Sequence, residues 1–141
     1  MSTTTRPVLS TKSPYWISKH RYYELKHFCL QYCDWKRMVN MIDTDIEYYN
    51  TSSVPNRANP YKVNKPTEKL AIQKTYFLNK IEAVEKTCKN TDPSLGDYIL
   101  EAVTKGFSYY ILQARTGIPC SKSTYYELYR KFFWLLDKEL A

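Results

Sequence analysis

The sequence predicts an all-α fold: a small helical domain ending in a helix-turn-helix, with a disordered N-terminal arm and a Pro/Asn-rich central loop. Three glycines in 141 residues and little strand-like alternation argue against a sheet. Apolar residues instead recur at helical spacings of three and four along several segments. An apolar share of 43% is enough for a core, and the length fits one domain.

The first half of the chain is predicted to hold an arm and two helices. Residues 1–14 are rich in Ser and Thr, which predicts a disordered arm. Residues 15–49 are predicted to form a helical pair, in which Ser18 and Asp34 are the candidate N-caps. The first of these helices has one apolar face, made of Tyr22, Leu25, Cys29 and Tyr32.

Residues 50–66 are predicted to form a loop, because Pro55, Pro60 and Pro66 interrupt any regular element. Two interpretations of this loop remain open. It is either a plain linker or a basic arm that touches phosphate through Arg57, Lys62 and Lys65.

Residues 67–141 are predicted to be a helical segment. Its first helix opens at Thr67 and ends near Lys89. The next begins at Asp92-Pro93-Ser94, and Gly106 is suited to stop it.

Residues 106–138 are predicted to form the helix-turn-helix. Ser108 is placed to cap the first helix, Gly117 to end it in a left-handed conformation, and Ile118 to plug the turn. Either Ser121 or Ser123 caps the second helix. The residues of that helix expected in the core are Tyr125, Leu128 or Tyr129, Phe132 and Leu136.

The opposite face of the second helix has short polar side chains at its start and some cationic side chains further along, as in a recognition helix. The net charge of +7 favours an anionic partner, although the charges balance from Thr91 to the end. An ordinary helical hairpin with a solvated outer face remains the alternative. The candidate DNA-binding residues are Lys122, Ser123, Thr124, Tyr126, Glu127, Arg130 and Lys131, with Arg57, Lys62 and Lys65 upstream.

Two blocks of sequence resemble a known family: residues 106–112 (GFSYYIL) and residues 117–131 (GIPCSKSTYYELYRK). They resemble the last helix-turn-helix of sigma-factor region 4 and, more closely, the small Firmicutes phage regulators of the ArpU and RinA type. The resemblance implies a helical protein that binds double-stranded DNA, works with RNA polymerase and activates late phage genes. The sequence departs from the family in two ways. The turn is two residues longer than the usual sigma-type turn. The cluster Phe132-Phe133-Trp134 contains more aromatic residues than a typical recognition helix needs, and this cluster suggests a docking or dimer surface.

A protein-binding function is the second hypothesis. The 14 tyrosines are typical of binding surfaces, which fits a phage inhibitor of a host system such as an anti-CRISPR. A small terminase-like packaging subunit is a third, fainter hypothesis.

Other function classes are not expected. His20, His27, Cys29 and Cys33 lack the second ligand pair of a zinc site, and Asp43, Asp45 and Glu47 fit a solvated helix end. We therefore expect no metal, no cofactor and no enzymatic activity. No apolar run approaches the roughly 20 residues of a membrane span, so we expect a cytoplasmic chain with its four cysteines reduced.

Overall fold

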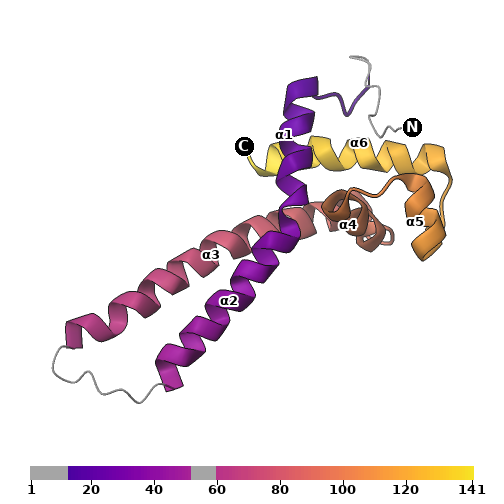
Figure 1. The fold of residues 1–141 in the computed structure, drawn as a ribbon. Coiled ribbons are helices and arrows are strands. Elements are labelled where there is room, and N and C mark those ends of the chain that lie inside the picture. The colour runs from indigo at the N-terminus through magenta and orange to yellow at the C-terminus, as the bar shows by residue number, and fades with distance from the viewer. Residues whose placement is uncertain (1–12, 52–59) are drawn as a thin grey trace. The chain divides into compact units, whose positions relative to one another are not determined.

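A computed structural model describes residues 13–51 and 60–141, with only the backbone of residues 60–66. This described part contains six helices and no strand (Figure 1), so the all-α fold class is confirmed. The helices are α1 (Lys19–Leu30), α2 (Tyr32–Thr51), α3 (Pro60–Thr91), α4 (Gly96–Lys105), α5 (Tyr109–Thr116) and α6 (Lys122–Glu139).

The chain divides into two compact units, one made of Met1–Tyr32 with Ala83–Ala141 and the other of Cys33–Glu82. In the first unit, α1 packs against α4 and α6, and α5 contacts the same two helices. Its fully buried side chains come from every helix of the unit and form one core: Leu25, Cys29, Val84, Cys88, Ile99, Leu112, Tyr125, Phe132, Phe133 and Leu136.

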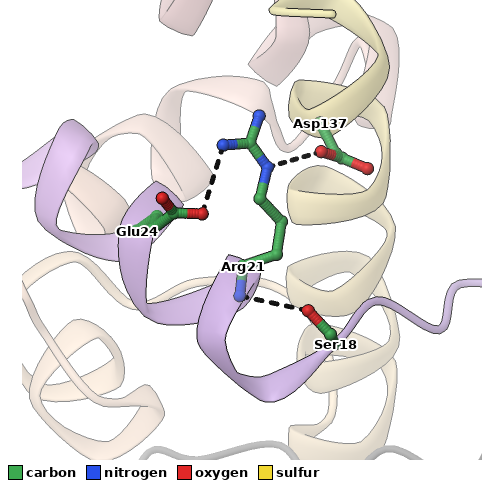
Figure 2. Close-up of polar contacts among 4 residues, drawn as sticks. All are labelled: Ser18, Arg21, Glu24 and Asp137. Carbon is green, nitrogen blue, oxygen red and sulfur yellow. Dashed lines mark hydrogen bonds and ion pairs between the residues drawn. The ribbon is translucent and has the colours of Figure 1, made fainter.

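The contact between α1 and α6 joins residues from opposite ends of the sequence. Ser18 caps α1 by accepting a hydrogen bond from the backbone N–H of Arg21, as expected. Arg21 then extends toward α6, where its Nε lies 2.6 Å from Oδ1 of Asp137, while a terminal nitrogen pairs with Glu24 (Figure 2). Deeper in the core, the hydroxyls of Tyr22 and Tyr129 lie 3.0 Å apart.

Three helix starts differ from the sequence-based prediction. α4 begins at Gly96 and not at Asp92-Pro93-Ser94, because Asp92 accepts hydrogen bonds from the backbone N–H groups of Ser94 and Leu95 in a turn that precedes the helix. α2 begins at Tyr32, so Asp34 lies in its first turn, near the positive end of the helix dipole, and is not the cap. α3 begins at Pro60 and not at Thr67, because proline lacks the N–H that the first helical position leaves unpaired. The predicted loop of residues 50–66 is therefore wrong at residues 50–51 and 60–66, which are helical, and its remaining residues lie outside the described part of the chain.

The second unit is a helical hairpin of α2 and the first part of α3. Lys74 Nζ pairs with Asp43 Oδ1 at 2.6 Å, and Lys80 Nζ lies 5.7 Å from the ring centre of Trp35. These two contacts set an antiparallel register between the helices. The predicted arm of residues 1–14 lies outside the described residues except for Ser13 and Pro14, which belong to a turn.

Candidate nucleic-acid interface

α5, a turn at residues 117–121 and α6 form the candidate interface. Ser108 caps α5 by accepting a hydrogen bond from Ile111 N–H, and Gly117 ends it with φ +66°, both as predicted. Of the two serines left open by the sequence, Ser121 is the cap of α6, because its hydroxyl accepts from Thr124 N–H. Ser123 is therefore exposed in the first turn of α6.

The turn between α5 and α6 is held in place by a buried side chain and by a hydrogen bond. Ile118 is buried beneath it, as predicted. The hydroxyl of Tyr109 donates to the backbone carbonyl of Cys120 at 2.6 Å, and its ring packs on Tyr125 with centres 5.6 Å apart. These contacts make the turn a fixed connection between the helices.

One face of α6 fills the core of the first unit. Tyr125, Tyr129, Phe132 and Leu136 are buried, so Tyr129 and not the half-buried Leu128 continues the apolar stripe. Phe132 and Phe133 are buried too, so the expectation of a docking surface at residues 132–134 is wrong for these two rings.

The opposite face of α6 carries most of the predicted DNA-binding residues. Ser123, Thr124 and Glu127 are exposed, whereas Arg130 and Lys131 are half-buried. Their spacings of three and four place them along one side of the helix. Arg130 makes no ion pair or hydrogen bond with any described residue.

Lys122 is the predicted residue whose environment differs most from a free recognition side chain. Its Nζ donates to the hydroxyl of Tyr110 on α5 at 2.9 Å and lies 4.6 Å from the centre of that ring. The hydrogen bond to Tyr110 raises the pKa of Lys122, and the nearby Tyr126 adds to this effect. Lys122, Tyr110 and Tyr126 therefore form one polar group at the junction of α5 and α6.

α5 carries two further exposed polar side chains that were not predicted as part of the interface, and one of them, Tyr110, contacts α6. Tyr110 is 65% exposed, and Arg115 is exposed and stacks over Phe107, with its Cζ 5.1 Å from the ring centre. The position of Tyr110 in the first turn of α5, two residues after the Ser108 cap, was the available signal, but its pairing with Lys122 depends on the path of the turn between the helices.

Three acidic residues of the last third form ion pairs with basic residues outside the candidate interface. Asp137 pairs with Arg21, Glu139 with Lys86 and Glu101 with Lys105. Asp92 accepts hydrogen bonds from the Ser94 hydroxyl and from two backbone N–H groups. These bonds, the Ser94 hydroxyl first, and the nearby Lys131 lower its pKa.

Residues 108–136 contain four basic side chains and one acidic one. The basic side chains are Arg115, Lys122, Arg130 and Lys131, and the acidic one is Glu127.

The basic residues predicted upstream belong to another part of the chain, and the structure does not place their side chains. Lys62 and Lys65 lie in the first turns of α3, in the second unit, and their side chains are outside the described part of the structure. Arg57 also lies outside the described residues.

Residues 13–51 and 60–141 offer little for other kinds of site. There, no three His, Cys, Asp or Glu side chains gather closely enough to hold a metal ion. The four cysteines are free thiols, with Cys29 and Cys88 buried. No helix within these residues has the length and apolar character needed to cross a membrane. No protein-family model, curated protein or solved structure matches the chain.

Proposed function

We propose that the chain binds double-stranded DNA through α5, the turn and α6, with α6 as the recognition helix. The observation that carries the proposal is the face of α6 opposite the core. It begins with short polar side chains at Ser123 and Thr124, and Arg130 and Lys131 follow two turns later. In recognition helices the residues at the N-terminus contact base edges, and cations contact phosphates. The small polar residues at the start of α6 and the cations further along match this division.

Each residue has a role in this proposal. Ser123 and Thr124 enter the major groove at the N-terminus of α6, where exposed backbone N–H groups also favour phosphate. Glu127 accepts from the amino group of cytosine, the base that a carboxylate recognises. Arg130 and Lys131 contact the phosphate strand, which contributes affinity without sequence preference.

α5 contributes a second line of backbone contacts. In helix-turn-helix proteins the first helix crosses the phosphate backbone. Tyr110 and Lys122 offer a hydroxyl and an ammonium from one place, and Arg115 adds a guanidinium one turn further along α5. The resemblance to the ArpU and RinA type of phage regulators adds a role in transcription, as an activator of late genes.

A titration of duplex DNA tests the proposal. Fluorescence anisotropy with a mixed-sequence duplex is expected to show binding that weakens steeply as salt rises. Glu127→Gln removes a repulsive charge from the DNA face and is expected to tighten this non-specific binding by a few fold. The matched control Glu47→Gln, which changes an exposed carboxylate on α2, is expected to leave it unchanged.

Two results would overturn the proposal. One is the absence of duplex binding even at low salt. The other is an equal effect of Glu127→Gln and Glu47→Gln, because binding would then depend on total charge and not on α6.

A further inference from the structure

The α2–α3 hairpin exposes more of its large apolar side chains than it buries. Within the described residues of this unit, the buried apolar side chains are Trp35, Ile42 and Ile81. We call the line of contact between the two helices the seam. Because few apolar side chains are buried in the seam, much of the apolar surface of both helices remains free for another partner. The exposed side chains are Met38, Met41, Tyr48, Tyr49, Ile72, Tyr76 and Leu78.

The exposed residues of α2 gather along one flank of the helix. Met38 and Met41 directly precede Val39 and Ile42, which face α3, and Asp45 and Tyr48 continue the same line at spacings of four and three. Met41 is 54% exposed and Tyr48 is 65% exposed. This line is a second stripe beside the seam, and its residues are mainly apolar.

α3 has a matching flank on the same face of the hairpin. Tyr76 and Lys80 directly precede the seam residues Phe77 and Ile81, and Lys69 occupies the same line seven residues before Tyr76. In two right-handed helices that run antiparallel, the residues just before the seam lie on one face of the pair. The position of Lys80 over the rings of both Trp35 and Tyr76, at 5.7 and 4.6 Å, agrees with this placement.

We propose that a second copy of the chain covers this face and that the two hairpins form a four-helix bundle. The hairpin face is defined by Met38, Met41, Asp45, Tyr48, Lys69 and Tyr76. A two-fold axis parallel to the helices lays α2 of one copy on α3 of the other at the same level. The inference goes beyond the proposed function and does not depend on it.

Charge complementarity favours a second copy as the occupant. On the hairpin face, α2 carries the carboxylate of Asp45 and α3 carries the ammonium of Lys69, and neither forms an ion pair with a described residue. The register set by Lys74 and Asp43 places Asp45 and Lys69 within about one helical turn of the same level. Stacking α2 on α3 of the other copy therefore brings opposite charges together twice, once on each side of the axis.

The size of the face also fits a dimer. At about 1.5 Å per residue α2 is about 30 Å long, and two helices about 10 Å apart present a face about 20 Å wide. This gives roughly 600 Å² on each copy, which reaches the lower limit of about 1,200 Å² in total for a specific interface.

Sedimentation velocity of the full chain without DNA tests this inference over a hundredfold range of concentration. The unmodified chain is expected to convert from monomer to dimer as its concentration rises. Met41→Glu places a charge on the hairpin face and is expected to weaken dimerisation by about tenfold or more. The matched control is Leu78→Glu, because Leu78 is 40% exposed and directly follows the seam residue Phe77, on the opposite flank of α3.

A charge exchange separates this pairing from a general loss of stability. Asp45→Lys alone is expected to weaken the dimer, and Asp45→Lys combined with Lys69→Glu is expected to restore it. A chain that stays monomeric at every concentration would overturn the inference, as would equal effects of Met41→Glu and Leu78→Glu. Failure of the exchange to restore the dimer would contradict the stacking of α2 on α3. Because no DNA is present, none of these results bears on the proposed function.

Discussion

Two buried tyrosines of α6 have different hydrogen bonding. The hydroxyl of Tyr129 pairs with that of Tyr22, whereas the buried hydroxyl of Tyr125 has no hydrogen-bond partner among the described residues. Leaving a buried hydroxyl unpaired costs about 1–3 kcal/mol, and burial also raises the pKa of Tyr125.

Phenylalanine substitutions at the two positions are therefore expected to have opposite effects. Tyr125→Phe should leave the free energy of unfolding unchanged or raise it by about 1 kcal/mol, and Tyr129→Phe should lower it by about 1 kcal/mol. Urea denaturation followed by circular dichroism measures both values. An equal loss for the two variants would show that Tyr125 has a partner.

The four thiols are expected to differ in reactivity according to their burial. Burial raises the pKa of Cys88 to about 12 and raises that of Cys29 well above its usual value. Since the thiolate is the reactive species, these two should resist alkylation at pH 8, whereas the exposed Cys33 should react quickly. Mass spectrometry of peptides after timed labelling measures this order. Labelling of Cys88 as fast as that of Cys33 would contradict the burial of Cys88 in the core.

At the scale of the element, the two serines at the start of α6 have separate roles. Ser121→Ala removes the cap and should lower the free energy of unfolding by about 1 kcal/mol. Ser123→Ala changes an exposed side chain, so it should leave stability within about 0.5 kcal/mol and weaken binding to a selected DNA site. Thermal unfolding of the two variants measures the effect on stability, and fluorescence anisotropy measures the effect on DNA binding. Together they distinguish the helix cap from the proposed DNA contact. If Ser123→Ala lowered the free energy of unfolding more than Ser121→Ala, the assignment of Ser121 as the cap would be wrong.

The end of α5 depends on the backbone conformation of Gly117. Its φ of +66° is left-handed, and an added Cβ would meet nothing within 4 Å. Gly117→Ala should therefore cost about 1–2 kcal/mol from the backbone conformation alone. Gly117→Asn should cost less, because asparagine tolerates this conformation better. Urea denaturation measures the free energy of unfolding of both variants. Values equal to that of the original chain would show that position 117 does not need a residue that tolerates the left-handed conformation.

Local signals at helix ends allowed much of the element order to be predicted. Ser18, Ser108 and the glycines 106 and 117 act within one turn of the chain, and the structure confirms each of them. The start of α3 was not predicted, because proline interrupts a helix or begins one depending on its position. Contacts such as Arg21 with Asp137 join residues 116 positions apart and have no local signal.

At the scale of the whole molecule, net charge alone gave an incomplete prediction of the interface. Counted along the sequence, the whole excess charge of +7 lies before Thr91, and the basic and acidic residues after that point are equal in number. The structure shows which charges cancel, because Asp137, Glu139 and Glu101 are paired with other basic residues while Arg130 has no such partner in the described residues. Helical spacing was enough to predict the outer face of α6. The pairing of Lys122 with Tyr110 required the path of the turn.

The salt dependence of DNA binding is the most direct test of the central claim that α6 is the DNA-binding element. Arg130→Ala combined with Lys131→Ala should weaken binding to a mixed-sequence duplex and reduce the slope of log K against log salt by about 2, one for each lost phosphate contact. Lys105→Ala, which removes an exposed charge at the end of α4, should leave the slope unchanged. A slope that the double variant does not alter would contradict the claim.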